Sequence, residues 1–97
     1  MTTVELDAYV LDSLMPDLVG HDRQPSAFLV YLFLWRGTRG GHEPLQASLL
    51  DIVAGTGLAK RTVQAALQTL ARRRLVATAR ASITAVPIYT LRRPWRR

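Results

Sequence analysis

A chain of 97 residues with an ordinary share of apolar side chains is long enough for one domain with its own core, which excludes a disordered composition. It has no cysteine, which excludes a disulfide framework and a thiolate metal site. The net charge of +6 is unevenly spread: residues 1–51 hold seven acids against three bases, whereas residues 52–97 hold ten bases and no acid. This asymmetry favours a polyanionic partner for the second half over a merely solvated basic surface.

The first predicted element is an amphipathic helix over residues 3–18. Thr2 and Glu5 have the spacing of a capping box. Pro16 predicts a kink or an end within the pattern. Acids occupy one face, so the helix suits either covering the core or self-association better than DNA contact. The opposite face carries an apolar stripe at helical spacing, formed by Leu6, Val10, Leu14 and Leu18.

The longest apolar run, from Ala27 to Trp35, predicts a second helix. Periodicity does not separate a buried helix from a buried strand here, but its length, the preceding Pro25 and the glycine-rich sequence that follows favour a helix. A helix that is apolar on every side is expected at the centre of the domain. The run is too short to cross a bilayer and no signal-peptide pattern precedes it, so we expect a cytoplasmic protein without membrane association.

A short strand near Leu45 and Ala47 is predicted next, followed by two helices. Ser48 caps the first of these helices, and Asp51 completes a variant of the capping box. The second helix is expected from Ala59 to Arg74. Its inner stripe is Ala59, Val63, Ala66, Leu67 and Leu70.

The remaining residues predict a hairpin and a tail. Residues 76–80 and 85–91 are strand-like and are joined by a turn. Pro87 must lie where the ladder needs no N–H donor. Residues 92–97 form a basic tail, in which Trp95 serves either as an aromatic for stacking or dimer contact, or as a packing anchor.

A short helix, a tight turn and a second helix form a helix-turn-helix unit, and a hairpin directly after it makes the unit winged. The stretches LLDIVAGTGLAKRTVQAALQTLARRRLV and IYTL resemble the winged helix-turn-helix family of bacterial and archaeal regulators. The resemblance rests on Gly57-Leu58, on Thr62-Val63 and on the returning Tyr89-Thr90-Leu91. Two positions depart from that family: Ala59 stands where Ser or Thr usually caps the helix, and Arg74 stands where Gly often ends it.

The resemblance implies a mainly α fold with a small β-hairpin, namely a winged helix-turn-helix with an extra N-terminal helix. We expect a single domain over residues 1–97. Within it, residues 1–20 are the extra helix and a candidate dimerisation element, residues 48–76 the helix-turn-helix, residues 76–91 the wing, and residues 92–97 the tail.

The polar side of the second helix is the candidate site. Opposite the inner stripe it presents amides, hydroxyls, a guanidinium and a methyl group but no carboxylate, and these are the groups that read base edges. Lys60 and Arg61 oppose the helix dipole, yet they suit a helix start that faces phosphates. An exposed helix end with two solvated bases is the alternative, and Arg72 to Arg74 also suit a helix C-terminus for structural reasons alone. The predicted DNA-binding residues are Lys60, Arg61, Thr62, Gln64, Ala65, Gln68, Arg72, Arg80, Arg92 and Arg93.

The predicted function is sequence-specific binding of double-stranded DNA by a transcriptional regulator, as a homodimer because operators are usually read as paired half-sites. One alternative is a winged-helix module that docks onto an acidic protein surface, and another is a sequence-tolerant architectural, replication or partition protein. Ser13 has no nearby His, and His21 and His42 stand apart from other metal ligands. We therefore expect no enzyme activity, metal or cofactor, and the sequence indicates no small-molecule ligand.

Overall fold

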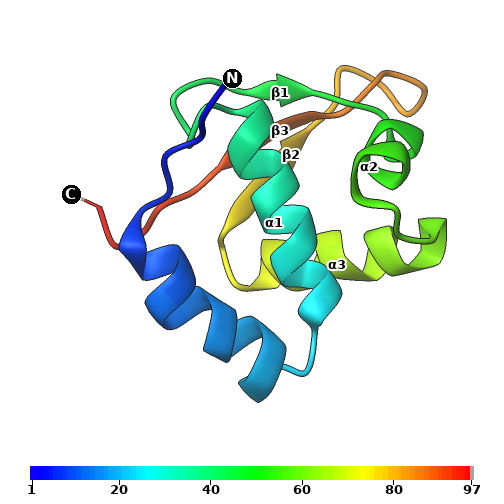
Figure 1. The fold of residues 1–97 in the computed structure, drawn as a ribbon. Helices are drawn as coiled ribbons and strands as arrows, with labels where there is room; N and C mark the ends of the chain where they lie inside the picture. Colours follow the sequence, from blue (N-terminus) through cyan, green and yellow to red (C-terminus); the bar gives the residue numbers. More distant parts are fainter. Residues whose placement is uncertain (97) are drawn as a thin grey trace.

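A layer of helices packed against a small antiparallel sheet makes up the fold (Figure 1). The computed structural model describes residues 1–96, so Arg97, the last residue of the predicted tail, lies outside the described residues. Within residues 1–96, none of the helices combines the length and the apolar character needed to cross a membrane. The elements in chain order are η1 (Val10–Leu14), η2 (Pro16–His21), α1 (Pro25–Gly37), β1 (Leu45–Gln46), α2 (Leu49–Thr56), α3 (Lys60–Arg72), β2 (Val76–Ala79) and β3 (Ile88–Leu91).

The N-terminal helix differs from the prediction in its start, its end and its winding. Residues 1–7 are not helical, so the capping box expected between Thr2 and Glu5 does not form. The indole N–H of Trp35 instead donates to the carbonyl of Glu5 at 2.7 Å, which holds this segment against the end of α1. Helical winding runs from Ala8 to His21, mostly as π-helix. Pro16 opens η2 rather than ending the helix, because a widened turn accommodates a residue without an N–H donor.

Helix α1 runs through the middle of the molecule, as the apolar run predicts (Figure 1). Pro25 occupies its first turn, and Thr38 ends it with a hydroxyl that donates to the carbonyl of Leu34 at 2.7 Å. Helix α1 contacts η2, α2 and α3, so most of its circumference is covered. On the N-terminal helix, Val10, Leu14 and Leu18 are buried in this same core, whereas Leu6 stays exposed. Most of the apolar stripe that was a candidate for dimerisation is therefore already buried within the chain.

The two helices predicted after the first strand are confirmed, with small shifts at their ends. The Asp51 N–H donates to Ser48 Oγ at 3.1 Å, and the Ser48 N–H donates to the Asp51 carboxylate at 2.8 Å, so the capping box forms. Gly57 turns the chain with a φ of 76°. Helix α3 stops at Arg72, two residues earlier than predicted. Arg74 then adopts a φ of 57°, the left-handed conformation for which glycine is the usual residue.

Burial along α3 departs from the predicted stripe at three positions. Thr69, outside the stripe, is buried with 5% of its surface exposed. Val63, Ala66 and Leu70 are fully buried. Leu67 is only half-buried and Ala59 is exposed, because Ala59 precedes the helix and turns away from the core. The buried side of α3 packs against α1, so the polar side faces away from α1.

The hairpin of β2 and β3 is confirmed, and β1 joins it to give the antiparallel order β1-β3-β2. Leu45 pairs with Tyr89, which in turn pairs with Thr78 on the other side. Along β3, Tyr89 and Leu91 are buried while their neighbours are exposed, the alternation of a strand with one face on the core. Pro87 lies just before β3 and donates nothing to the ladder.

The C-terminal segment packs against the N-terminal segment instead of extending into solvent; Figure 1 shows the red end of the chain reaching the start of the blue helix. The Trp95 ring stacks on Tyr9 with 4.6 Å between ring centroids, and it lies 6.5 Å from the Trp35 ring. The Trp95 indole N–H and the Arg96 Nε each donate to the Asp7 carboxylate at 2.7 Å. Trp95 is therefore a packing anchor. We call Asp7, Tyr9, Trp35, Trp95 and Arg96 the terminal clamp.

Candidate nucleic-acid interface

Helix α3 exposes a continuous polar side with no carboxylate on the whole helix. Its sequence places Val63, Ala66 and Leu70 on one side by helical spacing, and that side is buried. Of the predicted site residues on this helix, Thr62 alone is half-buried, and the others are exposed. We call these exposed residues the α3 face: Lys60, Arg61, Gln64, Ala65, Gln68 and Arg72.

The start of α3 is held by the turn that precedes it. The Thr56 hydroxyl donates to the carbonyl of Ile52 at 2.7 Å and accepts from the Leu58 N–H at 3.2 Å. This bond pair fixes where α3 begins relative to α2. Ala59 supplies no side-chain cap, so the first-turn N–H groups of α3 have no side-chain acceptor there. The two exposed cations therefore stand beside uncapped N–H donors, an arrangement that favours an anion.

Arg80 lies in the tip of the β2–β3 hairpin. Its guanidinium donates to the carbonyl of Ile83 at 3.3 Å, and residues 80–84 are all exposed. Ile83 is 92% exposed, so the tip has no packing partner within residues 1–96. In Figure 1 the orange tip lies on the same side of the view as α2 and the start of α3.

Arg92 and Arg93 differ in their exposure and in their contacts. Arg92 is exposed, and its backbone is fixed at both ends: its N–H donates to Leu75 at 2.8 Å and its carbonyl accepts from the Tyr31 hydroxyl at 2.9 Å. Arg93 is half-buried beside Gly41, and its Nη1 is buried without a hydrogen-bond partner among the described residues. Of the two, Arg92 is the more exposed.

Arg74, which is not among the predicted DNA-binding residues, lies next to the α3 face. It is exposed, and it lines a shallow hollow together with Arg92 and Ala71, at the C-terminal end of α3. The left-handed backbone at Arg74 sends the chain from α3 into β2. The signal in the sequence was an arginine at a position where glycine commonly ends the helix.

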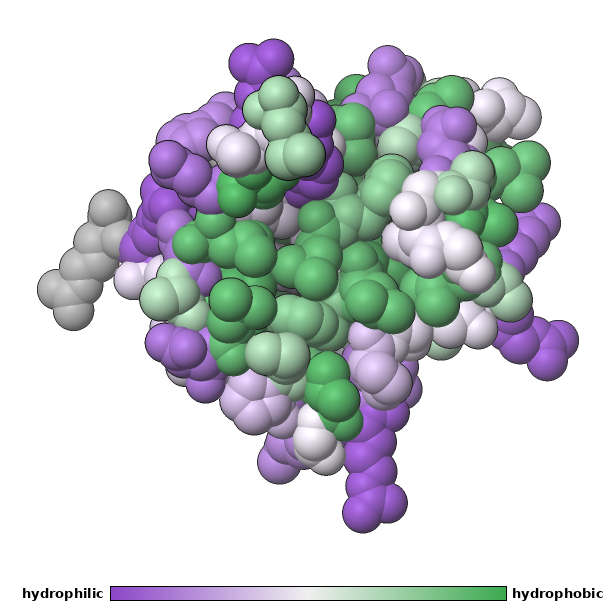
Figure 2. Space-filling view, in the orientation of Figure 1, coloured by the Kyte–Doolittle hydropathy of each residue, from purple (hydrophilic) through white to green (hydrophobic). Residues whose placement is uncertain are grey.

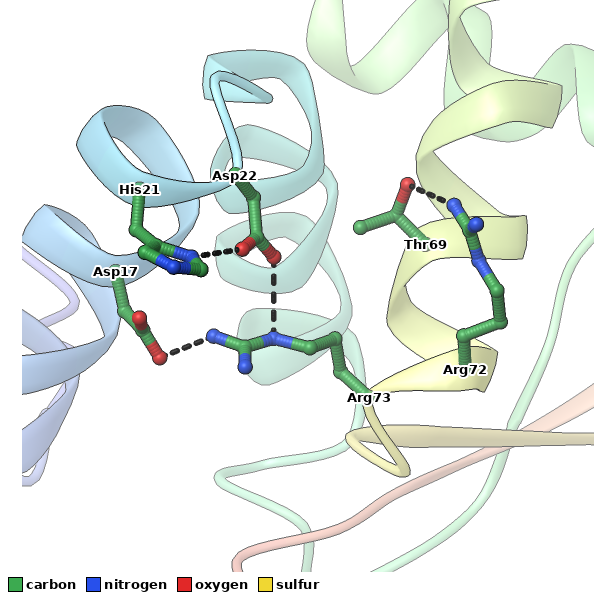
Figure 3. A network of polar contacts seen from close by, with 6 residues as sticks. All are labelled: Asp17, His21, Asp22, Thr69, Arg72 and Arg73. Atoms are coloured by element: carbon green, nitrogen blue, oxygen red, sulfur yellow. Dashed lines mark hydrogen bonds and ion pairs between the residues drawn. The ribbon is translucent and has the colours of Figure 1, made fainter.

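Arg73 points the other way, toward the N-terminal helix (Figure 3). Its Nε lies 3.1 Å from the Asp22 carboxylate, and its Nη2 pairs with Asp17. His21 Nδ1 lies 2.9 Å from the other Asp22 oxygen. Arg72, by contrast, turns its guanidinium to the Thr69 hydroxyl at 3.3 Å. Arg73 thus serves as a structural contact between η2 and the end of α3.

This acidic cluster corrects the prediction that His21 stands alone. Ligand-type atoms of Asp17, His21 and Asp22 lie within 4.8 Å of one another. The Asp17 to His21 spacing of four residues on a helix was the missed signal. The Arg73 guanidinium contacts both carboxylates of the cluster, so these residues join η2 to the end of α3.

Shifted pKa values belong to contacts outside the α3 face. The hydrogen bond from Arg96, helped by the Trp95 N–H, lowers the pKa of Asp7 from 3.8 to about 2. Hydrogen bonds from Ser48 lower the pKa of Asp51. Burial raises the pKa of Tyr31 and of Tyr89. Asp7 and Asp51 are thus held by hydrogen bonds within the fold.

No protein-family model, curated protein or solved structure matches the chain. Our interpretation of the function therefore rests on the residues of the α3 face and on the charges around it.

Proposed function

We propose that this chain is a winged helix-turn-helix protein that binds double-stranded DNA as a transcriptional regulator. Helix α3 enters the major groove, and the β2–β3 hairpin follows the backbone or minor groove. The observation that carries this proposal is the α3 face: an exposed helix side of bases, amides and one methyl group, in a half of the chain that has no acid.

The side chains of the α3 face suit base reading. A major groove about 12 Å wide admits one α-helix. Gln64 and Gln68 lie one turn apart, and a glutamine amide pairs with the edge of adenine. Arg61 offers a bidentate fit to guanine, and Ala65 offers a methyl contact for thymine. Sequence preference would arise from these four positions.

Phosphate contacts would come from both ends of α3. Lys60 stands at the first turn, while Arg72, Arg74 and Arg92 gather near the last turn. Asp17 and Asp22, which lie near that last turn, are both paired with Arg73. Arginine and lysine side chains placed at both ends of a reading helix fix its register on the duplex.

Salt dependence tests the proposal directly. Contacts to about six phosphates would lower the affinity for duplex DNA roughly a hundredfold or more between about 50 and 200 mM salt. Fluorescence anisotropy with labelled genomic fragments at these two salt concentrations measures the change. Absence of binding at the lower salt concentration would refute DNA binding and favour the protein-interaction module.

Substitution of Gln64 separates sequence-specific from sequence-tolerant binding. Gln64→Ala should cost about 1–3 kcal/mol on the preferred site, selected from a random pool, and almost nothing on random DNA. Gln46→Ala, an exposed glutamine on β1, is the matched control and should change neither affinity. Equal losses on both DNAs for Gln64→Ala would identify a sequence-tolerant architectural binder instead.

A further inference from the structure

The side of the molecule seen in Figure 2 is largely apolar. On the N-terminal helix, Leu11 is 45% exposed, and Met15 and Val19 are each 38% exposed. On α1, Leu29 is 45% exposed, and its neighbours Leu32 and Phe33 are half-buried. We call these six residues the apolar face.

The two stripes of the apolar face lie on one side of the fold. On the N-terminal helix, Val10, Leu14 and Leu18 face the core. Asp17 lies on one side of this buried stripe and pairs with Arg73 at the end of α3. Helical spacing puts Met15 on the opposite flank, away from α3. On α1, the exposed Leu29 also points away from the core side that packs on α3. Figure 2 shows the apolar surface continuing from the N-terminal helix across α1.

The apolar face continues toward α2. Leu29, Leu32 and Phe33 line a hollow together with Gly55 and Thr56. Phe33 lies so close to Gly55 that a side chain there would collide with the ring. The apolar face therefore lies on the N-terminal helix and α1, and this hollow extends it to the edge of α2. Contiguous exposed apolar surface of this kind marks an interaction site.

Charge at the edges of the apolar face selects the partner. Asp12 is exposed at the outer edge on the N-terminal helix, and Arg36 is exposed at the end of α1. Neither forms an ion pair within residues 1–96. A nucleic acid needs an excess of positive charge, which this face lacks. An apolar centre with one charge of each sign at separate edges is complementary to itself, as a two-fold interface requires.

We propose that the apolar face binds a second copy of the chain and that the resulting pair links two separate DNA segments. Helix α1 carries three residues of the apolar face, and its core side packs against α3. The α3 face points away from α1, so a symmetric pair joined through its apolar faces presents its two α3 faces on opposite sides. One duplex cannot contact both. The pairing stands independently, whereas the linking of two duplexes rests on the proposed function.

Sedimentation of the full chain tests the pairing. We expect the mass of a dimer at tens of micromolar protein. Leu29→Lys and Met15→Lys, on different helices, should each weaken association roughly tenfold or more, because each puts two like charges into an apolar interface. Ile83→Lys, at the exposed hairpin tip, is the matched control and should leave the dimer intact. A monomeric wild-type chain, or a dimer that neither face variant weakens, overturns the pairing.

Capture of one duplex by another tests the linking. A genomic fragment fixed to beads, with the protein bound at low salt, should retain a second labelled fragment. Leu29→Lys adds a positive charge, so it should bind a single fragment at least as well as the wild type but retain no second one. A dimer that binds DNA yet retains no second fragment overturns the outward arrangement. A dimer that binds no DNA refutes the proposed function, and the linking with it, while the pairing stands.

Discussion

Asp7 shows how much of this fold depends on one carboxylate. It accepts hydrogen bonds from both Trp95 and Arg96, which lie 88 and 89 residues further along the chain. These donors favour the ionised form, and they lower its pKa from 3.8 to about 2. A carboxyl group with a lower pKa in the folded chain than in the unfolded chain stabilises the fold above the unfolded value. That contribution is lost as the pH falls through the folded value.

Asp7→Asn should therefore lower the melting temperature at neutral pH, with a difference from the wild type that shrinks between pH 3.8 and about pH 2. Thermal unfolding followed by circular dichroism at a series of pH values measures this difference. Asp12→Asn is the control, because Asp12 is exposed and forms no ion pair within residues 1–96. A difference for Asp7→Asn that stays constant through the window would show that the charge of Asp7 does not stabilise the clamp.

At the scale of the elements, Arg73 joins the N-terminal helix to the end of α3. Arg73→Ala removes the guanidinium that Asp17 and Asp22 share and leaves two like charges close together, so it should lower the free energy of unfolding by about 1 kcal/mol. Arg73→Lys should recover only part of this loss, because an ammonium lacks the planar fork that reaches two carboxylates.

Urea unfolding measures both Arg73 variants. Arg72→Ala is the control, since Arg72 turns to Thr69 and should matter little for stability. Arg73→Ala should also have only a small, sequence-independent effect on DNA binding, because its guanidinium is already occupied. Wild-type stability for Arg73→Ala would mean that the two helices are joined by apolar packing alone.

Elements that are specified locally were predictable from the sequence. Ser48 and Asp51 stand three residues apart and cap α2 as expected, and Gly57 supplies the turn that α3 needs. Thr2 and Glu5 have the same spacing, yet no helix starts there. Instead, the Trp35 indole N–H donates a hydrogen bond to the carbonyl of Glu5. The two residues are 30 positions apart, so no local sequence pattern predicts this bond.

The sequence predicted which side chains of α3 are exposed, but it did not predict where the arginines near the end of α3 and in the C-terminal segment lie. Gln64 and Gln68 lie on the exposed side because the apolar spacing of α3 fixes that side. The positions of Arg73 and Arg93 depend on segments far away in the sequence, namely η2 and the loop at Gly41. The helical spacing that identified the buried stripe also left Met15 and Val19 on a free flank, but the prediction did not consider a second apolar stripe beside the first.

For the whole molecule, the terminal clamp is the contact that closes the fold. Trp95→Ala removes a ring that stacks on Tyr9 and lies beside Trp35, and it removes an N–H donor from Asp7. We expect a loss of about 2–4 kcal/mol in the free energy of unfolding, somewhat below the usual cost at a fully buried tryptophan because Trp95 is half-buried. Trp95→Phe should lose less, since it keeps a stacked ring and removes only the donor. Denaturant titration of both variants tests this, and equal stability of Trp95→Ala and wild type would show that the clamp contributes nothing.

The middle position of β3 in the sheet also constrains the order of events during folding. Strand β1 pairs only with β3, which comes last in the sequence of strands, and the clamp joins residues 88 positions apart. Helices α2 and α3, joined by their own turn, can form from neighbouring residues alone. Closing a long loop costs entropy before its contacts form, so the clamp and β1 should assemble after the transition state. Their interactions should then mainly slow unfolding and have little effect on the rate of folding. The lifetime of the native state therefore depends on them.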